Sequence, residues 1–164
     1  MLYPQSNDSR IVFPLDGVWD FRTAGEDSYP AEWADAPLPE PWPMAVPGSY
    51  NDQNDELNLR AHYGWVVYQR SFAVPSRLVA GQRMILRFDA ATHAADVYLN
   101  GQLLGSHFGG FLPFEFDVTS ALHAGENLLT VAVDNRIGSS TLPVGNDAGT
   151  AFMGSDNANV PAVC

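Results

Sequence analysis

The sequence contains no lysine and a single cysteine. All eight basic residues are arginines, and they stand against nineteen acidic residues, which gives a net charge of −11. Contacts to phosphate groups need clustered basic side chains, so this balance argues against nucleic acid and anionic membranes as partners. Cys164 is the last residue, so no disulfide can form within the chain, and its thiol is interpreted as incidental rather than catalytic.

Long apolar runs and the common metal and cofactor motifs are missing as well. No C-x₂-C, H-E-x-x-H, G-x-S-x-G or G-x-G-x-x-G pattern occurs, so we predict neither a metal nor a cofactor. Residues 1–10 are polar and lack the apolar core of a signal peptide, which favours a soluble, cytoplasmic protein. The chain has 164 residues. It can therefore bury one core, but it is too short for a (β/α)₈ barrel of about 250 residues.

Short strands dominate what is present. Twelve prolines and fourteen glycines interrupt the chain, and larger side chains recur at every second position rather than with a helical period. Asn100-Gly101 between two alternating runs predicts a type I′ hairpin, because both residues tolerate positive φ. The pattern predicts strands over 15–22, 68–74, 84–88, 96–99, 102–105, 114–118 and 127–134. We therefore expect an all-β sandwich or jelly roll.

Two stretches lack this alternation. Residues 24–47 contain six prolines and predict a long surface excursion with at most a short helix at 31–34. Residues 137–164 are rich in Gly, Ser, Asn and Ala and predict a loop followed by a poorly ordered tail.

Acidic residues form two groups that could carry chemistry. Asp52, Asp55 and Glu56 could serve as an acid–base pair or hold a cation, but a solvated loop in an acidic protein is the interpretation that we favour. Glu115 and Asp117 share one face of a strand, which is typical of the solvent side of a sandwich. The four histidines share no motif and are expected to be turn or packing residues.

Two aromatic residues flank Gly64 at the start of a predicted strand. Tyr63 and Trp65 could stack on sugar rings, whose apolar face matches a π surface, although core packing is the preferred interpretation for Trp65. Composition and spacing alone therefore indicate an acidic β-sandwich domain without an active site of its own.

Five blocks, taken together, carry a family resemblance. Residues 15–21 resemble the opening of the sugar-binding domain of glycoside hydrolase family 2, and residues 46–53 are particularly similar to its β-glucuronidases. The blocks 63–70, 87–101 and 109–119 follow in the family's order and spacing. The resemblance implies a galactose-binding-domain-like jelly roll at the N-terminus of a retaining β-glucuronidase.

In that family, two glutamates of a C-terminal barrel carry out catalysis, and the acid/base glutamate follows an asparagine. No glutamate of this chain follows an asparagine, so the resemblance implies no catalytic residue here and an inactive chain. It implies a domain that supports the absent barrel and helps to bind a β-glucuronide or related carbohydrate. Asn51, Asp52, Tyr63 and Trp65 are the candidates for the face turned towards the substrate, with fold maintenance as the alternative. A free-standing carbohydrate-binding module and a purely structural or interaction sandwich remain alternative functions.

The resemblance ends near Asn135. Family members continue into a His-Asp-Phe-Phe run and a last sandwich strand, which this sequence does not match. We therefore predict a sandwich domain over 1–147 and a divergent, flexible tail over 148–164, produced by truncation or a shifted reading frame. A jelly roll without its final strand exposes a sheet edge, which predicts a homo-oligomer through that edge or docking of the tail there.

Overall fold

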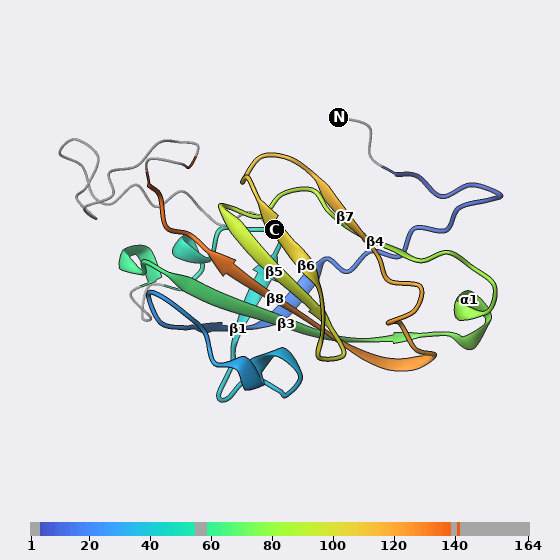
Figure 1. Cartoon of the computed structure of the whole chain (residues 1–164), viewed down its shortest axis with the longest axis horizontal. Helices are drawn as coiled ribbons and strands as arrows, with labels where there is room; N and C mark the ends of the chain where they lie inside the picture. The colour runs from blue at the N-terminus through green and yellow to red at the C-terminus, as the bar shows by residue number, and fades with distance from the viewer. Residues whose placement is uncertain (1–3, 55–58, 139–140, 142–164) are drawn as a thin grey trace.

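A computed structural model describes residues 4–54, 59–138 and 141 (Figure 1). Strands make up most of the described chain, and they pair antiparallel in two sheets. The elements follow in the order β1 (Gly17–Thr23), η1 (Ala31–Ala34), β2 (Trp42–Val46), η2 (Tyr50–Asp52), η4 (Leu59–Ala61), β3 (Trp65–Val74), α1 (Ser76–Val79), β4 (Ile85–Phe88), β5 (Ala94–Leu99), β6 (Gln102–Phe108), β7 (Phe114–Asp117) and β8 (Gly125–Asp134). The prediction of an all-β sandwich is confirmed. No helix in the described ranges is long and apolar enough to cross a membrane.

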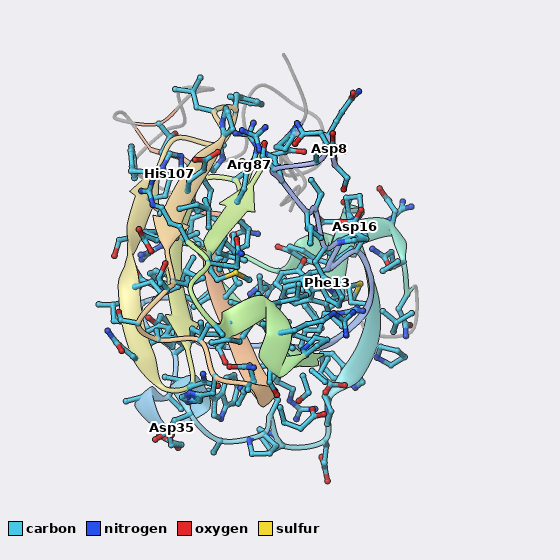
Figure 2. All side chains as sticks on the ribbon, turned by 90° about the vertical axis from the view of Figure 1, so that its right-hand side faces the viewer. Asp8, Phe13, Asp16, Asp35, Arg87 and His107 are labelled. Carbon is cyan, nitrogen blue, oxygen red and sulfur yellow. The ribbon has the colours of Figure 1, made fainter. Side chains whose placement is uncertain are left out.

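The larger sheet has six strands in the order β2-β1-β3-β8-β5-β6, and the second sheet has two, β4-β7. The two sheets form the layers of the sandwich, and Figure 2 shows acidic side chains such as Asp8, Asp16 and Asp35 at its surface. At the centre of the large sheet, β3 pairs with β8 over ten positions, from Trp65 opposite Asp134 to Val74 opposite Gly125. The strands at the middle of the sheet are therefore its longest.

The core lies between the layers and follows the period of two along each strand. On β3, Val66 and Tyr68 point inwards and are fully buried, together with Phe21 of β1. The rings of Phe21 and Tyr68 meet edge-on with centroids 4.9 Å apart, a favoured geometry for aromatic pairs. Phe88 of β4 closes the core from the opposite layer.

The predicted hairpin at Asn100-Gly101 is confirmed. Both residues have positive φ, 53° and 78°, and they connect β5 directly to β6. The Asn100 side chain also accepts a hydrogen bond from the Leu128 main-chain N–H at 2.9 Å, which ties the hairpin to β8. The turn therefore sets the pairing of β5 with β6 beside it, and the register shifts at a bulge between Val97 and Tyr98.

The interpretation of residues 24–47 as an excursion without strands is wrong in part. The expected short helix is present as η1, but the stretch also contains β2, paired along β1. Pro43 lies inside β2 opposite Asp20, and proline is tolerated there because β2 is an edge strand. Proline in this stretch is therefore compatible with a strand, provided that the strand lies at the edge of the sheet. The short helix α1, after Pro75, was also not predicted.

The side chain of Gln69 fastens this excursion to the outer face of the large sheet. Its amide nitrogen donates to the main-chain oxygens of Trp33 and Ala36 at 2.7 and 2.8 Å, and its oxygen accepts from the Leu38 N–H at 2.9 Å. Gln69 is only 1 % exposed, so water cannot replace these partners. One amide therefore satisfies three main-chain groups of a segment with little regular structure.

The predicted domain limit at residue 147, the tail 148–164 and the missing final strand concern residues outside the described ranges. They stay predictions.

Replacing Gln69 by leucine should lower the free energy of unfolding by about 3 kcal/mol or more, because three buried main-chain groups lose their partner. Urea unfolding followed by tryptophan fluorescence measures this change. Gln53 is the matched control, since its amide makes two similar bonds to Ala45 but is exposed. Gln53→Leu should cost about 1 kcal/mol or less, and equal losses in the two variants would contradict the role given to Gln69.

Candidate functional site

One end of the six-stranded sheet gathers most of the loops that carry polar and aromatic side chains. In the sheet register, Trp65 of β3 lies opposite Asp134 of β8, Asp134 opposite Ala94 of β5, and Ala94 opposite Phe108 of β6. The segments before β3 and β5 and after β6 and β8 therefore meet at the same end. We call this region the loop end, comprising residues 49–54, 59–64, 91–93, 109–113 and 135–138.

Asn135, directly after β8, links the segments of the loop end. Its side-chain oxygen accepts a hydrogen bond from the Gly64 N–H at 2.8 Å, and its amide nitrogen donates to the His62 main-chain oxygen at 2.9 Å and to the Tyr50 hydroxyl. Tyr50 is fully buried, and this burial raises the pKa of its hydroxyl to about 12. Asn135 therefore fixes the loop before β3 against η2 with a neutral, buried network.

Two of the predicted site residues, Asn51 and Asp52, lie side by side in η2 but point to different surroundings. Asn51 is 3 % exposed, and its amide donates to the Leu59 main-chain oxygen at 3.0 Å. The Asp52 carboxylate lies on the surface, 2.9 Å from the Arg60 guanidinium. The contacts of Asn51 are therefore structural. Asp55 and Glu56, named with Asp52 in the acidic group, lie outside the described residues.

The other two predicted residues, Tyr63 and Trp65, also differ in exposure. Tyr63 is 40 % exposed. Trp65 is half-buried, and its ring packs on Tyr29 with centroids 4.9 Å apart, on the outer face of the sheet beside Val67 and Leu38. These contacts agree with the packing interpretation of Trp65. A role for any of the four predicted residues in sugar binding stays a prediction.

A feature that the sequence reading missed is the apolar loop between β6 and β7. Phe108, Phe111 and Leu112 are 62, 59 and 66 % exposed. The backbone beneath them is held in place, because the Gly109 N–H donates to the His93 oxygen at 2.8 Å and the Thr92 hydroxyl donates to the Gly110 oxygen at 3.0 Å. The apolar run that follows two glycines was the available signal, since loops seldom expose such runs without a partner.

Gly110 itself is required by this packing. A Cβ atom at this position would come within 2.7 Å of the Thr92 hydroxyl oxygen, closer than real Cβ atoms approach. The loop can therefore sit against Thr92 only with glycine at 110.

At the loop end Arg136 is paired, His62 is half-buried and His93 is buried. Arg136 binds the Asp134 carboxylate through Nε and Nη2, at 3.0 and 2.8 Å, and these bonds raise the pKa of its guanidinium. Burial lowers the pKa of both His62 and His93. His62 Nε2 still lies 2.9 Å from the Trp65 oxygen, to which a neutral ring can donate. The loop end thus favours neutral histidines.

Glu115 and Asp117 lie on the exposed face of β7, as the solvent-side interpretation predicted. Each pairs with an arginine of the neighbouring chain segment, Glu115 with Arg87 at 2.7 Å and Asp117 with Arg83 at 2.9 Å. Bonds from Thr119 and Arg83 lower the pKa of Asp117 to about 2. No cluster of side chains suited to a metal ion occurs among the residues that the structure describes.

Comparisons with known proteins agree with one another. Residues 12–147 match the sequence model of the domain described as "Glycosyl hydrolases family 2, sugar binding domain". A β-glucuronidase of Paenibacillus borealis is 42 % identical over 147 residues, covering 88 % of this chain and 24 % of the relative. The human β-glucuronidase is 37 % identical over 158 residues, with the same coverage of both chains.

Solved structures give the same assignment. A β-glucuronidase of Bifidobacterium dentium, complexed with coumarin-3-O-glucuronide, is 99 % identical with a TM-score of 0.90, covering 99 % of this chain and 26 % of that one. A β-glucuronidase of Faecalibacterium prausnitzii is 54 % identical with a TM-score of 0.85, covering 97 % of this chain and 27 % of its own. The chain therefore spans about a quarter of the length of these relatives.

Replacing Asn135 by leucine should lower the free energy of unfolding by about 2–3 kcal/mol, because the Gly64 N–H and the His62 oxygen lose their partner. Asp52→Asn breaks an exposed ion pair in the same region and should cost about 0.5 kcal/mol or less. Urea unfolding of both variants measures the two changes in the free energy of unfolding. A loss for Asn135→Leu as small as that for Asp52→Asn would contradict the linking role of Asn135.

Stability should fall as the pH is lowered from 7.5 to 5.0. Burial lowers the pKa of His62 and His93 in the folded chain, whereas the unfolded chain protonates them near their ordinary pKa of 6.5. The unfolded state then binds more protons, so stability is fully present above that pKa and is lost as the pH falls below it. The lowered pKa of Asp117 acts only well below this window.

Thermal unfolding at several pH values measures this dependence. The double variant His62→Gln/His93→Met should show a clearly shallower fall of Tm between pH 7.5 and 5.0. The difference in Tm between the double variant and the original chain at pH 8 gives the loss of stability that does not depend on histidine protonation. A double variant with the full pH dependence of the original chain would refute the assignment to these two rings.

Proposed function

Because the chain belongs to the sugar-binding domains of glycosyl hydrolases family 2, we propose that it is the N-terminal accessory domain of a β-glucuronidase-type enzyme. The domain holds part of the enzyme in place around a β-glucuronide or related carbohydrate, and the hydrolysis itself takes place elsewhere in that enzyme. The observation that carries this proposal is coverage: the match fills most of this chain but only about a quarter of each β-glucuronidase relative.

The acidic groups of the chain support an inactive domain. A retaining glycosidase needs two carboxyl groups about 5 Å apart across the scissile bond. Glu115 and Asp117, the carboxylates that share a strand face, are exposed and each is paired with an arginine. Asp52 is likewise exposed and paired with Arg60. A general acid must be protonated near neutral pH, whereas the bonds from Thr119 and Arg83 lower the pKa of Asp117.

The loop end supports the accessory role. Three large apolar side chains face solvent here, Phe108 at the end of β6 and Phe111 and Leu112 in the loop after it, whose main chain is hydrogen bonded to residues 92 and 93. An exposed apolar cluster on an ordered loop is typical of an interface. We infer that this loop packs against the remainder of the enzyme, with Tyr63 and Asp52 nearer to the sugar. A cytoplasmic location also remains part of the proposal.

A free-standing carbohydrate-binding module is the second candidate. The exposed rings of Tyr63 and Phe111 favour it, because aromatic faces can stack on pyranose rings. The third alternative, a structural or interaction sandwich unrelated to sugars, is not supported, because the chain belongs to a family of sugar-binding domains.

The chain alone should not hydrolyse an aryl β-glucuronide, because the described candidate carboxylates Glu115, Asp117 and Asp52 are each exposed and paired with an arginine. Release of the aryl group is measured with protein from a host that lacks β-glucuronidase, and the intact Bifidobacterium dentium enzyme serves as positive control. Turnover by the chain would contradict the proposal.

Calorimetric titration with the same glucuronide and with oligosaccharides separates the two candidates. The accessory role predicts no saturable binding, because the rest of the site is absent. Saturable binding that is lost in Tyr63→Ala or Phe111→Ala would instead establish the module.

A further inference from the structure

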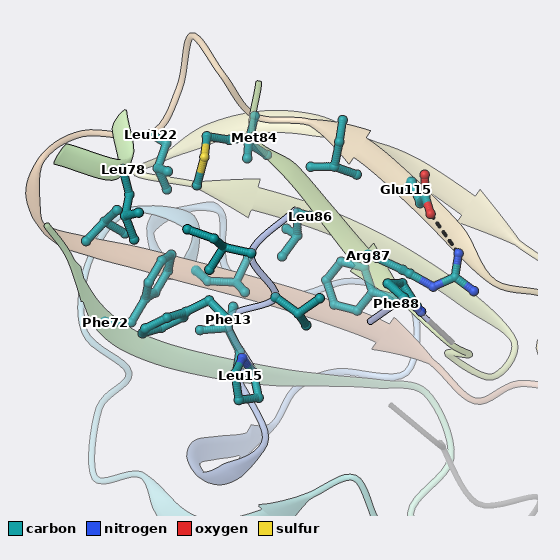
Figure 3. Close-up of a pocket in the computed structure, with 18 of the residues that line it drawn as sticks. Phe13, Leu15, Phe72, Leu78, Met84, Leu86, Arg87, Phe88, Glu115 and Leu122 are labelled. Atoms are coloured by element: carbon teal, nitrogen blue, oxygen red, sulfur yellow. Dashed lines mark hydrogen bonds and ion pairs between the residues drawn. The ribbon is translucent and has the colours of Figure 1, made fainter. Parts of the chain in front are cut away.

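One edge of the large sheet is formed by β2, whose side chains alternate between the two faces. Met44 and Val46 are buried on the inner face, and Val46 and Pro47 also line the largely apolar groove between the sheets that Figure 3 shows. Pro43 and Ala45 lie on the other face and are exposed. A strand added beside β2 would continue the apolar inner face of the sheet, so this edge is of the kind that recruits other chains.

The main chain of Ala45, in the middle of β2, is bonded to a side chain instead of a strand. Its N–H donates to Gln53 Oε1 at 2.7 Å, and its oxygen accepts from Gln53 Nε2 at 2.9 Å. In an antiparallel ladder, a residue exchanges the same two bonds with the residue opposite. The Gln53 amide therefore pairs with Ala45 in the way that the main chain of a neighbouring strand would.

The other position of β2 that faces away from β1 is Pro43. Main-chain groups of successive residues point to opposite sides of a strand, so Pro43 and Ala45 face the same way. Proline has no N–H and can offer a second strand only an acceptor. Along this edge, the N–H is therefore missing at residue 43 and occupied at residue 45.

The turn after β2 holds the Gln53 side chain in this position. Gln53 directly follows η2, and its N–H donates to the Tyr50 oxygen at 3.3 Å. Tyr50 and Asn51 are buried, so η2 is fixed to the body of the domain. Gly48 leaves room for the amide, since a Cβ atom there would lie 2.9 Å from Gln53 Nε2 and 3.1 Å from the Ala45 oxygen. The turn thus both positions the amide and keeps its place free.

We propose that Gln53 is a cap of the β2 edge, whose amide takes the place of a neighbouring strand and keeps this edge from pairing with a second copy of the chain. Gln53 is exposed, so its two bonds add little to the stability of the fold. Their effect is to occupy the groups that an incoming strand would need. The contact is made entirely by described residues, and a homo-oligomer through this edge is excluded while Gln53 is in place.

Sedimentation velocity of the complete chain tests the proposal, in about 0.5 M salt so that repulsion from the net charge of −11 is screened. Gln53→Leu frees both main-chain groups of Ala45, so this variant should self-associate about tenfold more tightly than the unchanged chain. Gln102→Leu is the matched control, because it replaces an exposed glutamine of the other edge strand, β6, without freeing a main-chain group of β2. It should associate like the unchanged chain.

The double variant Gln53→Leu/Ala45→Pro separates strand pairing from the effect of an added apolar side chain. The second substitution removes the N–H that Gln53 covers, and it breaks no bond to β1 because that N–H points away from β1. Met44 before it is already extended, as the residue before a proline has to be. The double variant should return to the association of the unchanged chain, which a merely apolar surface would not explain.

Amide hydrogen exchange, followed by NMR at low protein concentration, reads the cap directly. Exchange of the Ala45 N–H should be about tenfold faster in Gln53→Leu, whereas exchange of the Val67 N–H at the centre of the sheet should not change.

Three results would overturn the proposal. They are a folded Gln53→Leu that associates no more than the unchanged chain, an association that the second substitution does not reverse, and an unchanged exchange rate at Ala45. Circular dichroism shows whether each variant is folded. If the double variant does not fold, the exchange rate of Ala45 and the comparison with Gln102→Leu decide.

Discussion

The ten-residue antiparallel pairing of β3 with β8 is the interaction on which the rest of the structure depends. Every other strand of the large sheet is attached to one of these two, either directly or through one neighbour. The two strands carry the central buried side chains of the core, among them Val66, Tyr68 and Val131. Because the pairing runs without a register shift from Trp65–Asp134 to Val74–Gly125, it also determines which residues emerge at each end of the sheet.

The same pairing places two kinds of buried side chain on opposite faces of the large sheet. On the inner face, Tyr68 packs against Phe21 and contributes apolar area. On the outer face, the neighbouring Gln69 is equally buried but acts through hydrogen bonds to a proline-rich segment. A segment that cannot form a long helix or a central strand still needs partners for its main-chain groups, and one amide of β3 supplies them. The outer face is thus covered by a small apolar cluster around Leu38, Val67 and Ala132 together with these hydrogen bonds.

The sequence was sufficient to predict the strands and the Asn100-Gly101 hairpin, because alternation and turn chemistry are local properties. It was insufficient for β2, where Pro43 is compatible with a strand only at an edge, and an edge is a property of the whole sheet. The roles of Gln69 and Asn135 were missed for a related reason. Their partners are main-chain groups up to about 70 residues away, which no spacing rule connects. Of the predicted site residues, Asn51 and Trp65 prove to have structural contacts, whereas Asp52 and Tyr63 remain accessible.

The loop end and the β4 edge differ in what they can recognise. At the loop end, Asn135 and residues 92 and 93 bond the main chain of Gly64, Gly109 and Gly110, and exposed side chains such as Phe111 are available for recognition. In the described ranges β4 pairs only with β7, whose Glu115 and Asp117 are already paired with arginines, so β4 offers main-chain groups on its other side. Side-chain recognition is specific to a partner of matching shape, whereas an open main chain accepts any strand that its flanking charges allow. A partner at the loop end would therefore be selected by the shape of its surface, whereas a strand beside β4 would be held through its main chain.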